Sequence, residues 1–376
     1  MSVFHTLLLG ATGLTGSSVF QHFASLHSYL SWVNLANLKD DLELNHYVLV
    51  ISRSSFDLRD TVKLAFDELQ NSDLVEWHYS FFHDDDENDN QSVITYSTRL
   101  NDTFSVNINV LVSTIQEPDS TKWAEIIPKR LSTYDGLTNL SVISCLGSTS
   151  LGSKKSGVPR EWVDKTLNFE ILKAVTDNVS ISKKVTQYIA VTSFNNPALS
   201  KLFPYFKAKQ EFESDVKLLL EKSETCNSAI ILRPGPLIGK HGSTPVFVTP
   251  ELDDHLLRSV LKYKKAILSH YATRIKLWQD VGIATRASEL VAQISYKVPG
   301  ARLVGYPVKA NDCAIVIASE RIANALCKHS SHVKFRIINS QEIDSYKAEF
   351  SNSGADSVQA LPLSPAPVLV FNNLLS

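Results

Sequence analysis

Residues 3–16 read VFHTLLLGATGLTG, an apolar run of strand length that ends at Gly10 and is followed by two more glycines, Gly13 and Gly16. The apolar residues that come next at helical spacing are Val19, Phe20, Phe23 and Leu26. This pattern predicts a strand, a tight glycine turn and a helix. Gly10 permits the sharp turn, Gly13 allows a ligand phosphate to approach the backbone, and Gly16 allows the helix to pack closely on the strand.

A glycine turn between a strand and a helix is typical of dinucleotide-binding proteins, because the free N–H groups at the helix N-terminus face the pyrophosphate. We therefore expect an α/β protein with a Rossmann-like, doubly wound parallel sheet. The residues predicted to contact the dinucleotide are Gly10, Ala11, Thr12, Gly13, Leu14, Thr15 and Gly16. The alternative is a plain strand-to-helix turn without a ligand, since a lone glycine triplet is not specific.

The composition limits the class of protein. The chain has 376 residues, 44% of them hydrophobic, and a formal net charge of −2. It can bury a large core, and its charge and lack of a basic stripe argue against a nucleic-acid partner. The absence of an apolar run of about 18 residues predicts no membrane-spanning helix, and a core strand that starts at Val3 leaves no room for a cleavable presequence. The cysteines, at positions 145, 226, 313 and 327, have neither metal-binding nor redox spacing and are expected to be reduced thiols.

Arg53 stands at the end of a second predicted strand, Tyr47 to Ile51, between two serines. In dinucleotide-binding folds the residue at this strand tip faces the adenosine ribose. An acid there bonds the 2′-hydroxyl, whereas an arginine accommodates a 2′-phosphate. The sequence therefore favours NADP(H) over NAD(H) as the cofactor. The alternative is that Arg53 is an ordinary surface residue.

Further along, strand and helix patterns alternate, as expected for a parallel sheet with crossover helices. The expected strands are 106–115, 140–146, 188–191 and 333–338, and the expected helices are 123–131, 161–175, 205–220 and 311–327. Leu146 and Gly147 lie where the strand 140–146 ends. Because ligands bind at this end of the strands in open α/β sheets, both residues are predicted to contact the cofactor.

Residues 55–102 interrupt this alternation and are interpreted as an insertion. The segment contains a helical pattern at 58–69, an apolar run at 74–82 and an acidic tract at 84–90, which we expect to be a solvated loop rather than a metal site. Periodicity alone does not decide whether 74–82 or 106–115 is the third core strand.

We expect one dinucleotide-binding domain over residues 1–350, which includes a region at 240–332 that covers the substrate. A Ser/Pro-rich tail follows at 351–376. The apolar end of this tail, 368–371, is too short to span a bilayer, so it could only pack on the body or dock on a surface.

Three residues form a pattern that could catalyse proton transfer to a carbonyl group. Ser193 follows the strand 188–191, and Tyr205 and Lys209 stand four apart at the start of a helix, where they share one face. An ammonium group beside a phenol stabilises the phenolate, which allows the phenol to exchange a proton near neutral pH. We therefore predict that Ser193 orients a carbonyl, Tyr205 protonates it and Lys209 assists, while the cofactor delivers hydride. The alternative is that Tyr205 and Lys209 are ordinary helix-surface residues, because this spacing is common.

Together these motifs resemble the short-chain dehydrogenase/reductase superfamily, in its extended or atypical branch. Within it the chain looks most similar to the fungal mitochondrial-outer-membrane oxidoreductase-like proteins and the animal Tat-interacting oxidoreductase-like protein. Besides the glycine turn, the stretches that carry this resemblance are Asp119–Trp123, Val163–Asn168, Tyr205–Glu213, Ile230–Gly239 and Leu303–Val308. They span most of the chain as islands, and the Arg-Pro-Gly-Pro stretch at 233–236 is the most specific.

The resemblance implies further roles. Asn168 would support Lys209 through water and complete a catalytic tetrad. The residues implied to hold the nicotinamide are Pro234, Gly235, Pro236 and Leu237. The strand 106–115 would be the third core strand, and Arg53 would occupy a basic position of the family. The chain departs from the family in three ways: Thr192 replaces a serine, the interval from Ser193 to Tyr205 is short, and the chain is longer.

We expect an NADPH-dependent oxidoreductase that acts on a small carbonyl compound. Two alternatives remain: an NADP(H)-binding regulatory or scaffold protein with little turnover, and an epimerase or dehydratase that retains its nucleotide. The resemblance implies peripheral association with the mitochondrial outer membrane, with the cytoplasm as the alternative.

Overall fold

A computed structural model describes residues 2–23, 42–53, 90–101, 104–148, 153, 157–194, 200–201, 204–223, 226, 228–235, 237–238, 305–326 and 335–345. The predictions for residues 58–69, 74–82, 84–89, 240–304 and 351–376 lie outside this part of the chain.

The described part is built on one eight-stranded sheet. Its strands are β1 (Ser2–Leu9), β2 (Leu42–Ser52), β3 (Asn90–Asn101), β4 (Phe104–Gln116), β5 (Leu140–Ser144), β6 (Val185–Val191), β7 (Ser228–Arg233) and β10 (Arg336–Asn339). They lie in the order β10-β7-β6-β5-β1-β2-β4-β3, and every neighbouring pair except β3 and β4 is parallel. The chain runs outward from β1 to β4 and then returns to β5, so the order reverses beside β1. This is the Rossmann-like, doubly wound sheet predicted from the sequence.

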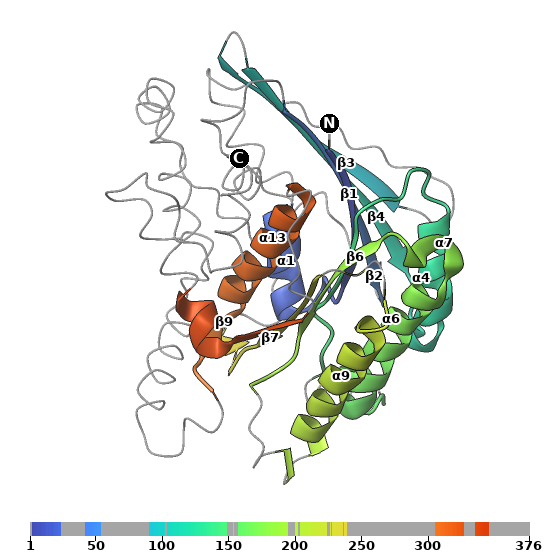
Figure 1. Cartoon of the computed structure of the whole chain (residues 1–376), viewed down its shortest axis with the longest axis vertical. Coiled ribbons are helices and arrows are strands. Elements are labelled where there is room, and N and C mark those ends of the chain that lie inside the picture. The colour runs from blue at the N-terminus through green and yellow to red at the C-terminus, as the bar shows by residue number, and fades with distance from the viewer. Residues whose placement is uncertain are drawn as a thin grey trace.

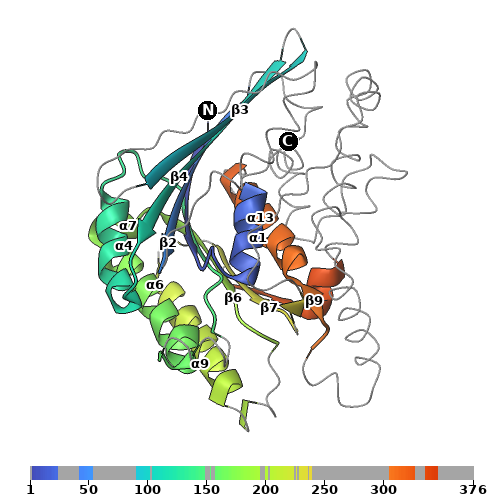
Figure 2. The same cartoon turned by 180° about the vertical axis from the view of Figure 1, so that it is seen from behind.

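Helices cover both faces of the sheet (Figures 1 and 2). On one face lie α1 (Leu14–Phe23) and α13 (Ala310–Leu326), which pack against each other. On the other face lie α4 (Trp123–Ser132), α6 (Asn168–Asp177), the short α7 (Val179–Ser182) and α9 (Pro204–Leu220). A 3₁₀ turn, η2 (Ser120–Lys122), precedes α4, and a two-residue parallel pair, β8 (Leu237–Ile238) with β9 (Val308–Lys309), lies apart from the main sheet.

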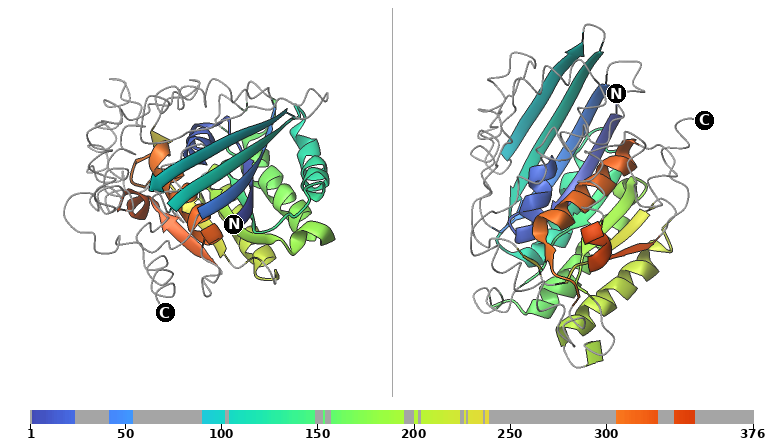
Figure 3. Two further views of the ribbon diagram at one scale, coloured as in Figure 1. Left: turned by 90° about the horizontal axis from the view of Figure 1, so that it is seen from above. Right: turned by 90° about the vertical axis from the view of Figure 1, so that its left-hand side faces the viewer.

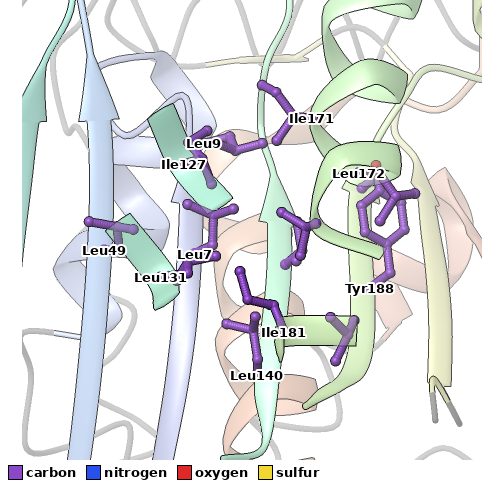
Figure 4. Close-up of a cluster of buried hydrophobic side chains, with 14 of the residues drawn as sticks. Leu7, Leu9, Leu49, Ile127, Leu131, Leu140, Ile171, Leu172, Ile181 and Tyr188 are labelled. Carbon is purple, nitrogen blue, oxygen red and sulfur yellow. The ribbon is translucent and has the colours of Figure 1, made fainter. Parts of the chain in front are cut away.

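The first strand shows why both faces need cover, because successive side chains of a strand point to opposite faces. Leu7 and Leu9 belong to the buried cluster beneath α4 and α6 (Figure 4). Phe4 and Thr6 contact Arg321 of α13 on the opposite face, through a cation–π contact at 4.8 Å and a hydrogen bond at 3.0 Å. The central strand is therefore buried on both sides.

Arg321 links the end of the described chain to its beginning. Its fully buried guanidinium donates hydrogen bonds to the carbonyl oxygens of His5, at 3.0 Å, and Asn139, at 2.7 Å. Residues 310–326 of the segment 240–332 thus form a helix that packs on the sheet beside α1.

The sequence missed the antiparallel edge strand β3, which occupies residues 90–101 of the segment interpreted as an insertion. Figure 3 shows β3 and β4, both teal, at one side of the sheet. The third strand in the parallel order is β4, at 104–116, so the question left open by periodicity is settled in favour of the run at 106–115.

β2 begins at Leu42, earlier than the predicted start at Tyr47, so the polar residues just before Tyr47 also belong to the sheet. The polar positions are tolerated there because they bond between strands. Asn109 of β4 donates a hydrogen bond from its side-chain amide to the Oδ1 atom of Asn45, at 2.8 Å.

Candidate functional site

The glycine turn joins β1 to α1 in the predicted manner. Gly10 has a φ of +81°, and a Cβ atom there would lie 2.8 Å from the carbonyl oxygen of Cys145. A Cβ atom on Gly16 would collide with the carbonyl group of Gly10. The N–H of Gly13 donates to the Gly10 carbonyl at 2.9 Å, which closes the turn. Glycine is therefore required at both ends of the turn for backbone reasons.

The turn residues differ in their exposure. Thr12 and Gly13 are exposed, and Gly10 and Leu14 are half-buried. Ala11 and Thr15, by contrast, are buried. Thr12 and Gly13 at the N-terminus of α1 are thus the turn residues most open to a phosphate-bearing ligand.

The end of β5 lies directly beside this turn. The N–H of Cys145 donates to the carbonyl of Leu9 at 2.9 Å, and Leu146 and Gly147 follow it. Leu146 is half-buried and Gly147 is exposed. Both predicted cofactor residues therefore stand at the carboxyl edge of the sheet, where the strand order reverses.

Asp164 joins this edge to the predicted catalytic lysine. Its Oδ1 atom lies 3.0 Å from the ammonium of Lys209 and accepts from the N–H of Ser148 at 3.3 Å. The side chains of Asp164 and Lys209 are 1% and 5% exposed. Within the described chain, Asp164 is the only ion-pair partner of this ammonium. A buried lysine charge needs such a partner, because desolvation would otherwise disfavour it.

Arg160 stands four residues before Asp164 and packs on the predicted acid. Its Nε atom lies 3.3 Å from the Oδ2 atom of Asp164, and its guanidinium carbon lies 3.6 Å from the ring centroid of Tyr205. The ammonium of Lys209 lies 6.0 Å from the same centroid. The half-buried Tyr205 ring thus has two cations near it, and both pair with the carboxylate of Asp164.

The segment that carries Asp164 is a widened π-helical turn, η3 (Trp162–Leu167), and not the start of one continuous α-helix. Such turns are rare and often accompany functional sites. The side-chain amide of Asn168 donates to the carbonyl of Val163 at 2.8 Å, and its Oδ1 atom accepts from the hydroxyl of Ser144. Asn168 therefore anchors the turn to β5. The described contacts contain no direct hydrogen bond between Asn168 and Lys209.

Ser193 follows β6 at the same edge. The neighbouring N–H of Phe194 donates to the carbonyl of Pro234 at 2.7 Å, which continues the pairing of β6 with β7. The Oγ atom of Ser193 is buried and has no hydrogen-bond partner among the described residues. A buried hydroxyl without a partner is uncommon and indicates a missing ligand or water. No hydrogen bond joins Ser193 to Tyr205 in the described part of the chain.

A second buried ion pair lies beneath this site. Glu213 of α9 bonds Arg233 of β7 through both carboxylate oxygens, at 2.5 Å for the shortest contact, and accepts from the hydroxyl of Thr192 at 2.7 Å. The threonine that replaces a serine of the family pattern therefore supplies a hydroxyl that ties β6 to α9. Arg233, the first residue of the Arg-Pro-Gly-Pro stretch, therefore pairs with Glu213 and links β7 to α9.

The predicted nicotinamide loop follows Arg233. Pro234 is buried, and a Cβ atom on Gly235 would collide with the carbonyl of Tyr306, so the loop packs tightly against the chain before β9. Leu237 is 37% exposed and pairs with Val308. Pro236 lies outside the described residues.

Arg53 is exposed at the carboxyl end of β2, beside β1. Glu117, the acidic residue that directly follows β4, accepts a hydrogen bond from the N–H of Asp119 through a carboxylate oxygen, at 2.8 Å. The side chain of Arg53 has no hydrogen bond or ion pair within the described chain. It is available to a charged ligand at the strand tip.

Sequence reasoning assigned no role to Arg160 or Asp164. A signal was present: Arg160, Asp164 and Asn168 are spaced by four, which places them on one helical face. The spacing does not show that this face packs on α9, so the contacts with Tyr205 and Lys209 could not be predicted from the sequence.

The residues present fit a dinucleotide. The glycine turn has no room for side chains at Gly10 and Gly16, and the N-terminus of α1 lies at the carboxyl edge of the sheet. The buried Ser193 hydroxyl at that edge has no hydrogen-bond partner among the described residues. Among the described residues no three metal-binding side chains gather, and none of the helices there is long and apolar enough to cross a membrane.

Solved structures with related architecture include an L-sorbose reductase from Gluconobacter frateurii complexed with NADPH and L-sorbose. It has a TM-score of 0.45 at 10% identity and covers 90% of this chain and 96% of its own. A 3-oxoacyl-[acyl-carrier protein] reductase from Brucella melitensis has a TM-score of 0.43 at 9% identity, with the same coverage. At these scores the fold assignment rests on the strand order of this chain itself.

Sequence relatives are fungal. The HIM1 family model matches residues 133–267. Protein HIM1 of Saccharomyces cerevisiae is 27% identical over 259 residues, 63% of this chain and 60% of that protein. The mitochondrial protein FMP52 of Candida albicans is 31% identical over 149 residues, 39% of this chain and 56% of that protein. The chain thus spans less than two thirds of the length of these relatives. It is similar to the HIM1 family over residues 133–267 and to FMP52 over 149 residues, which confirms the resemblance to the fungal oxidoreductase-like proteins.

Proposed function

We propose that the protein is an NADPH-dependent oxidoreductase that reduces a carbonyl compound. The observation that carries the proposal is the position of Tyr205. The phenol ring lies close to the Arg160 guanidinium and within 6.0 Å of the Lys209 ammonium, and Asp164 connects this cluster to Ser148 in the loop after β5. Because that strand end contacts the glycine turn, the predicted acid and the predicted phosphate site share one edge of the sheet.

Bound NADPH would supply the hydride. Its pyrophosphate would lie along Gly10 to Gly16, its 2′-phosphate on Arg53 and its nicotinamide against the loop at 234–237. Tyr205 would donate a proton to the carbonyl oxygen, and the two nearby cations would stabilise the negative charge that develops on the phenol oxygen. The partnerless hydroxyl of Ser193 would donate a hydrogen bond to the same carbonyl.

Lys209 and Asn168 would contribute to the reaction by holding other groups of the site in place. The ion pair with Asp164 holds the Lys209 ammonium near the ring, and Asn168 fixes the widened turn that carries Asp164. In the family pattern Asn168 also maintains a water path to the lysine, and we keep that role as part of the proposal.

Replacing Tyr205 with phenylalanine tests the assignment. Because a positioned general acid contributes about 10²- to 10⁴-fold, Tyr205→Phe should reduce NADPH oxidation with a panel of carbonyl compounds by at least about 100-fold. The dissociation constant for NADPH, measured by calorimetry, should stay unchanged. Tyr134→Phe, on the chain after α4, is the matched control and should retain full activity. Equal turnover in both variants would show that Tyr205 is not the proton donor.

A second candidate function is NADP(H)-dependent regulation or scaffolding with little or no turnover. The observation that favours it is the buried pairing of Lys209 with Asp164, which already uses the lysine charge for structure. This function predicts tight NADPH binding, no oxidation with any carbonyl, and no effect of Tyr205→Phe on either property.

We further propose that the protein associates peripherally with the mitochondrial outer membrane, with the cytoplasm as the alternative. The support is that the FMP52 relatives are named mitochondrial. Fractionation with carbonate extraction and protease treatment of intact mitochondria tests it. A peripheral outer-membrane protein is released by carbonate and digested from outside.

A further inference from the structure

We propose that Arg160 binds a carboxylate on the substrate, so that the substrate is a keto acid whose carboxylate lies close to the carbonyl. This inference rests on the proposed reductase function. It concerns a residue for which the sequence motifs predict no role.

The first argument is the state of the Arg160 guanidinium. Its Nε atom faces Asp164 at 3.3 Å, and no other ion pair or hydrogen bond of this group exists within the described chain. The side chain is 31% exposed. The two terminal nitrogens are therefore free to donate, and the planar fork of an arginine is suited to bind both oxygens of a carboxylate.

The second argument is the charge of the cluster. Arg160 and Lys209 carry two positive charges, and Asp164 carries one negative charge, which leaves a net charge of +1. Lys209 is buried, so the excess charge is accessible at Arg160. A carboxylate neutralises it with one negative charge, whereas a phosphate monoester carries close to two at neutral pH and would leave an excess.

The third argument is distance. The guanidinium carbon lies 3.6 Å from the centroid of the Tyr205 ring, whose hydroxyl is the proposed proton donor. A substrate that places its carbonyl oxygen on this hydroxyl and an anion on Arg160 has only a few bonds between the two groups. This requirement selects α-keto and β-keto acids over long-chain carbonyl compounds with a remote charge.

The experiment compares acids with their neutral methyl esters. Pyruvate, phenylpyruvate and acetoacetate are each assayed against the ester with NADPH in the full-length protein. We expect at least one acid to exceed its ester in kcat/KM by about tenfold or more, the range of a charge-assisted hydrogen bond. Arg160→Gln should abolish this preference, and Arg160→Lys should retain part of it.

The matched control is Arg130, which lies over the ring of Tyr134 at 5.8 Å, on α4 and away from the site. Arg130→Gln should leave the preference for acids unchanged. If the unaltered protein reduces these compounds without preferring any acid, or if Arg160→Gln keeps the preference, the inference is wrong. It is also wrong if Arg160→Gln weakens NADPH binding alone, because Arg160 would then contact the cofactor.

A binding assay separates this inference from the reductase function. Oxamate, an unreactive analogue of pyruvate, and the neutral oxamide are titrated by calorimetry into the protein with NADPH. Binding of oxamate that is lost in Arg160→Gln but kept in Tyr205→Phe supports the carboxylate site even if no turnover occurs. Binding of both probes with equal affinity overturns the site, whatever the activity.

Discussion

At the level of single residues, Arg53 is the residue that we expect to distinguish NADPH from NADH. It is exposed at the tip of β2 and has no partner within the described chain, so its charge is available to a phosphate. Arg53→Ala should weaken NADPH binding by about tenfold or more, because a charge-assisted hydrogen bond contributes about 1.5–3 kcal/mol. NADH binding should not change, since it lacks the 2′-phosphate. Calorimetry with both nucleotides measures the two values.

Lys173→Ala, at an exposed position of α6, is the control for a loss of surface charge. It should bind both nucleotides as the unaltered protein does. Parallel weakening of NADPH and NADH in Arg53→Ala would mean that Arg53 supports the fold of the strand tip, and that the preference has another origin.

At the level of residues, the sequence predicted contacts within one element and missed contacts between elements. Tyr205 and Lys209 were found because four-residue spacing on a helix fixes their common face. The partners Arg160 and Asp164 each stand 45 residues earlier in the chain (205 − 160 and 209 − 164), and their approach depends on how the segment that contains η3 packs against α9. Spacing along the chain carries no information about that packing.

At the level of elements, one ion pair joins the helix that carries Tyr205 to the sheet. Glu213 is 6% exposed and Arg233 21% exposed, and Thr192 bonds the same carboxylate. Glu213→Ala leaves a largely buried arginine without its partner, so we expect a loss of about 3–5 kcal/mol in the free energy of unfolding. Urea unfolding followed by circular dichroism measures this loss.

Two variants sharpen this test. Glu211→Ala removes a carboxylate two residues away on α9 whose side chain is 42% exposed, and its pair with Lys165 should contribute about 1 kcal/mol or less. Glu213→Ala combined with Arg233→Met removes both charges and should recover a large part of the loss. Equal effects of Glu211→Ala and Glu213→Ala would show that burial does not strengthen the inner pair.

The elements themselves were predictable where one signal dominated. The glycine turn predicted the first strand and helix, and residues 106–115 and 188–191, which are rich in apolar and β-branched side chains, predicted β4 and β6. β3 was missed because its neighbourhood, 84–90, is acidic and was interpreted as loop, although residues 92–98 are rich in Val, Ile, Thr and Tyr, which favour strands. The early start of β2 was missed because a polar residue such as Asn45 finds its partner only on the neighbouring strand.

At the level of the whole molecule, α1 and α13 meet through a buried histidine. The Nε2 atom of His22 donates to the Oδ1 atom of Asn311 at 3.2 Å, and burial lowers the pKa of His22 from 6.5 to about 4. The folded state therefore binds fewer protons than the unfolded state between these two values. Stability should fall as the pH decreases through this window.

His22→Gln keeps a donor for Asn311 and removes the titration. Between about pH 7 and about pH 5, the unaltered protein should lose about 2 kcal/mol more free energy of unfolding than this variant. Urea unfolding at both pH values gives the difference, and contributions from other groups, such as Glu320 with its pKa raised by burial, cancel in the comparison. Equal losses would show that the pKa of His22 is the same in the folded and the unfolded protein.

The bond between Arg321 and Thr6 joins residues 315 positions apart in the chain. A nascent chain can form the β1 and β2 pair early, but the face beneath α13 stays open to water until this distant helix has left the ribosome. Contacts of such long range slow folding and prolong the exposure of apolar surface. One face of the first strand is therefore covered only after nearly the last described helix is synthesised, so we expect the nascent chain to need chaperone protection.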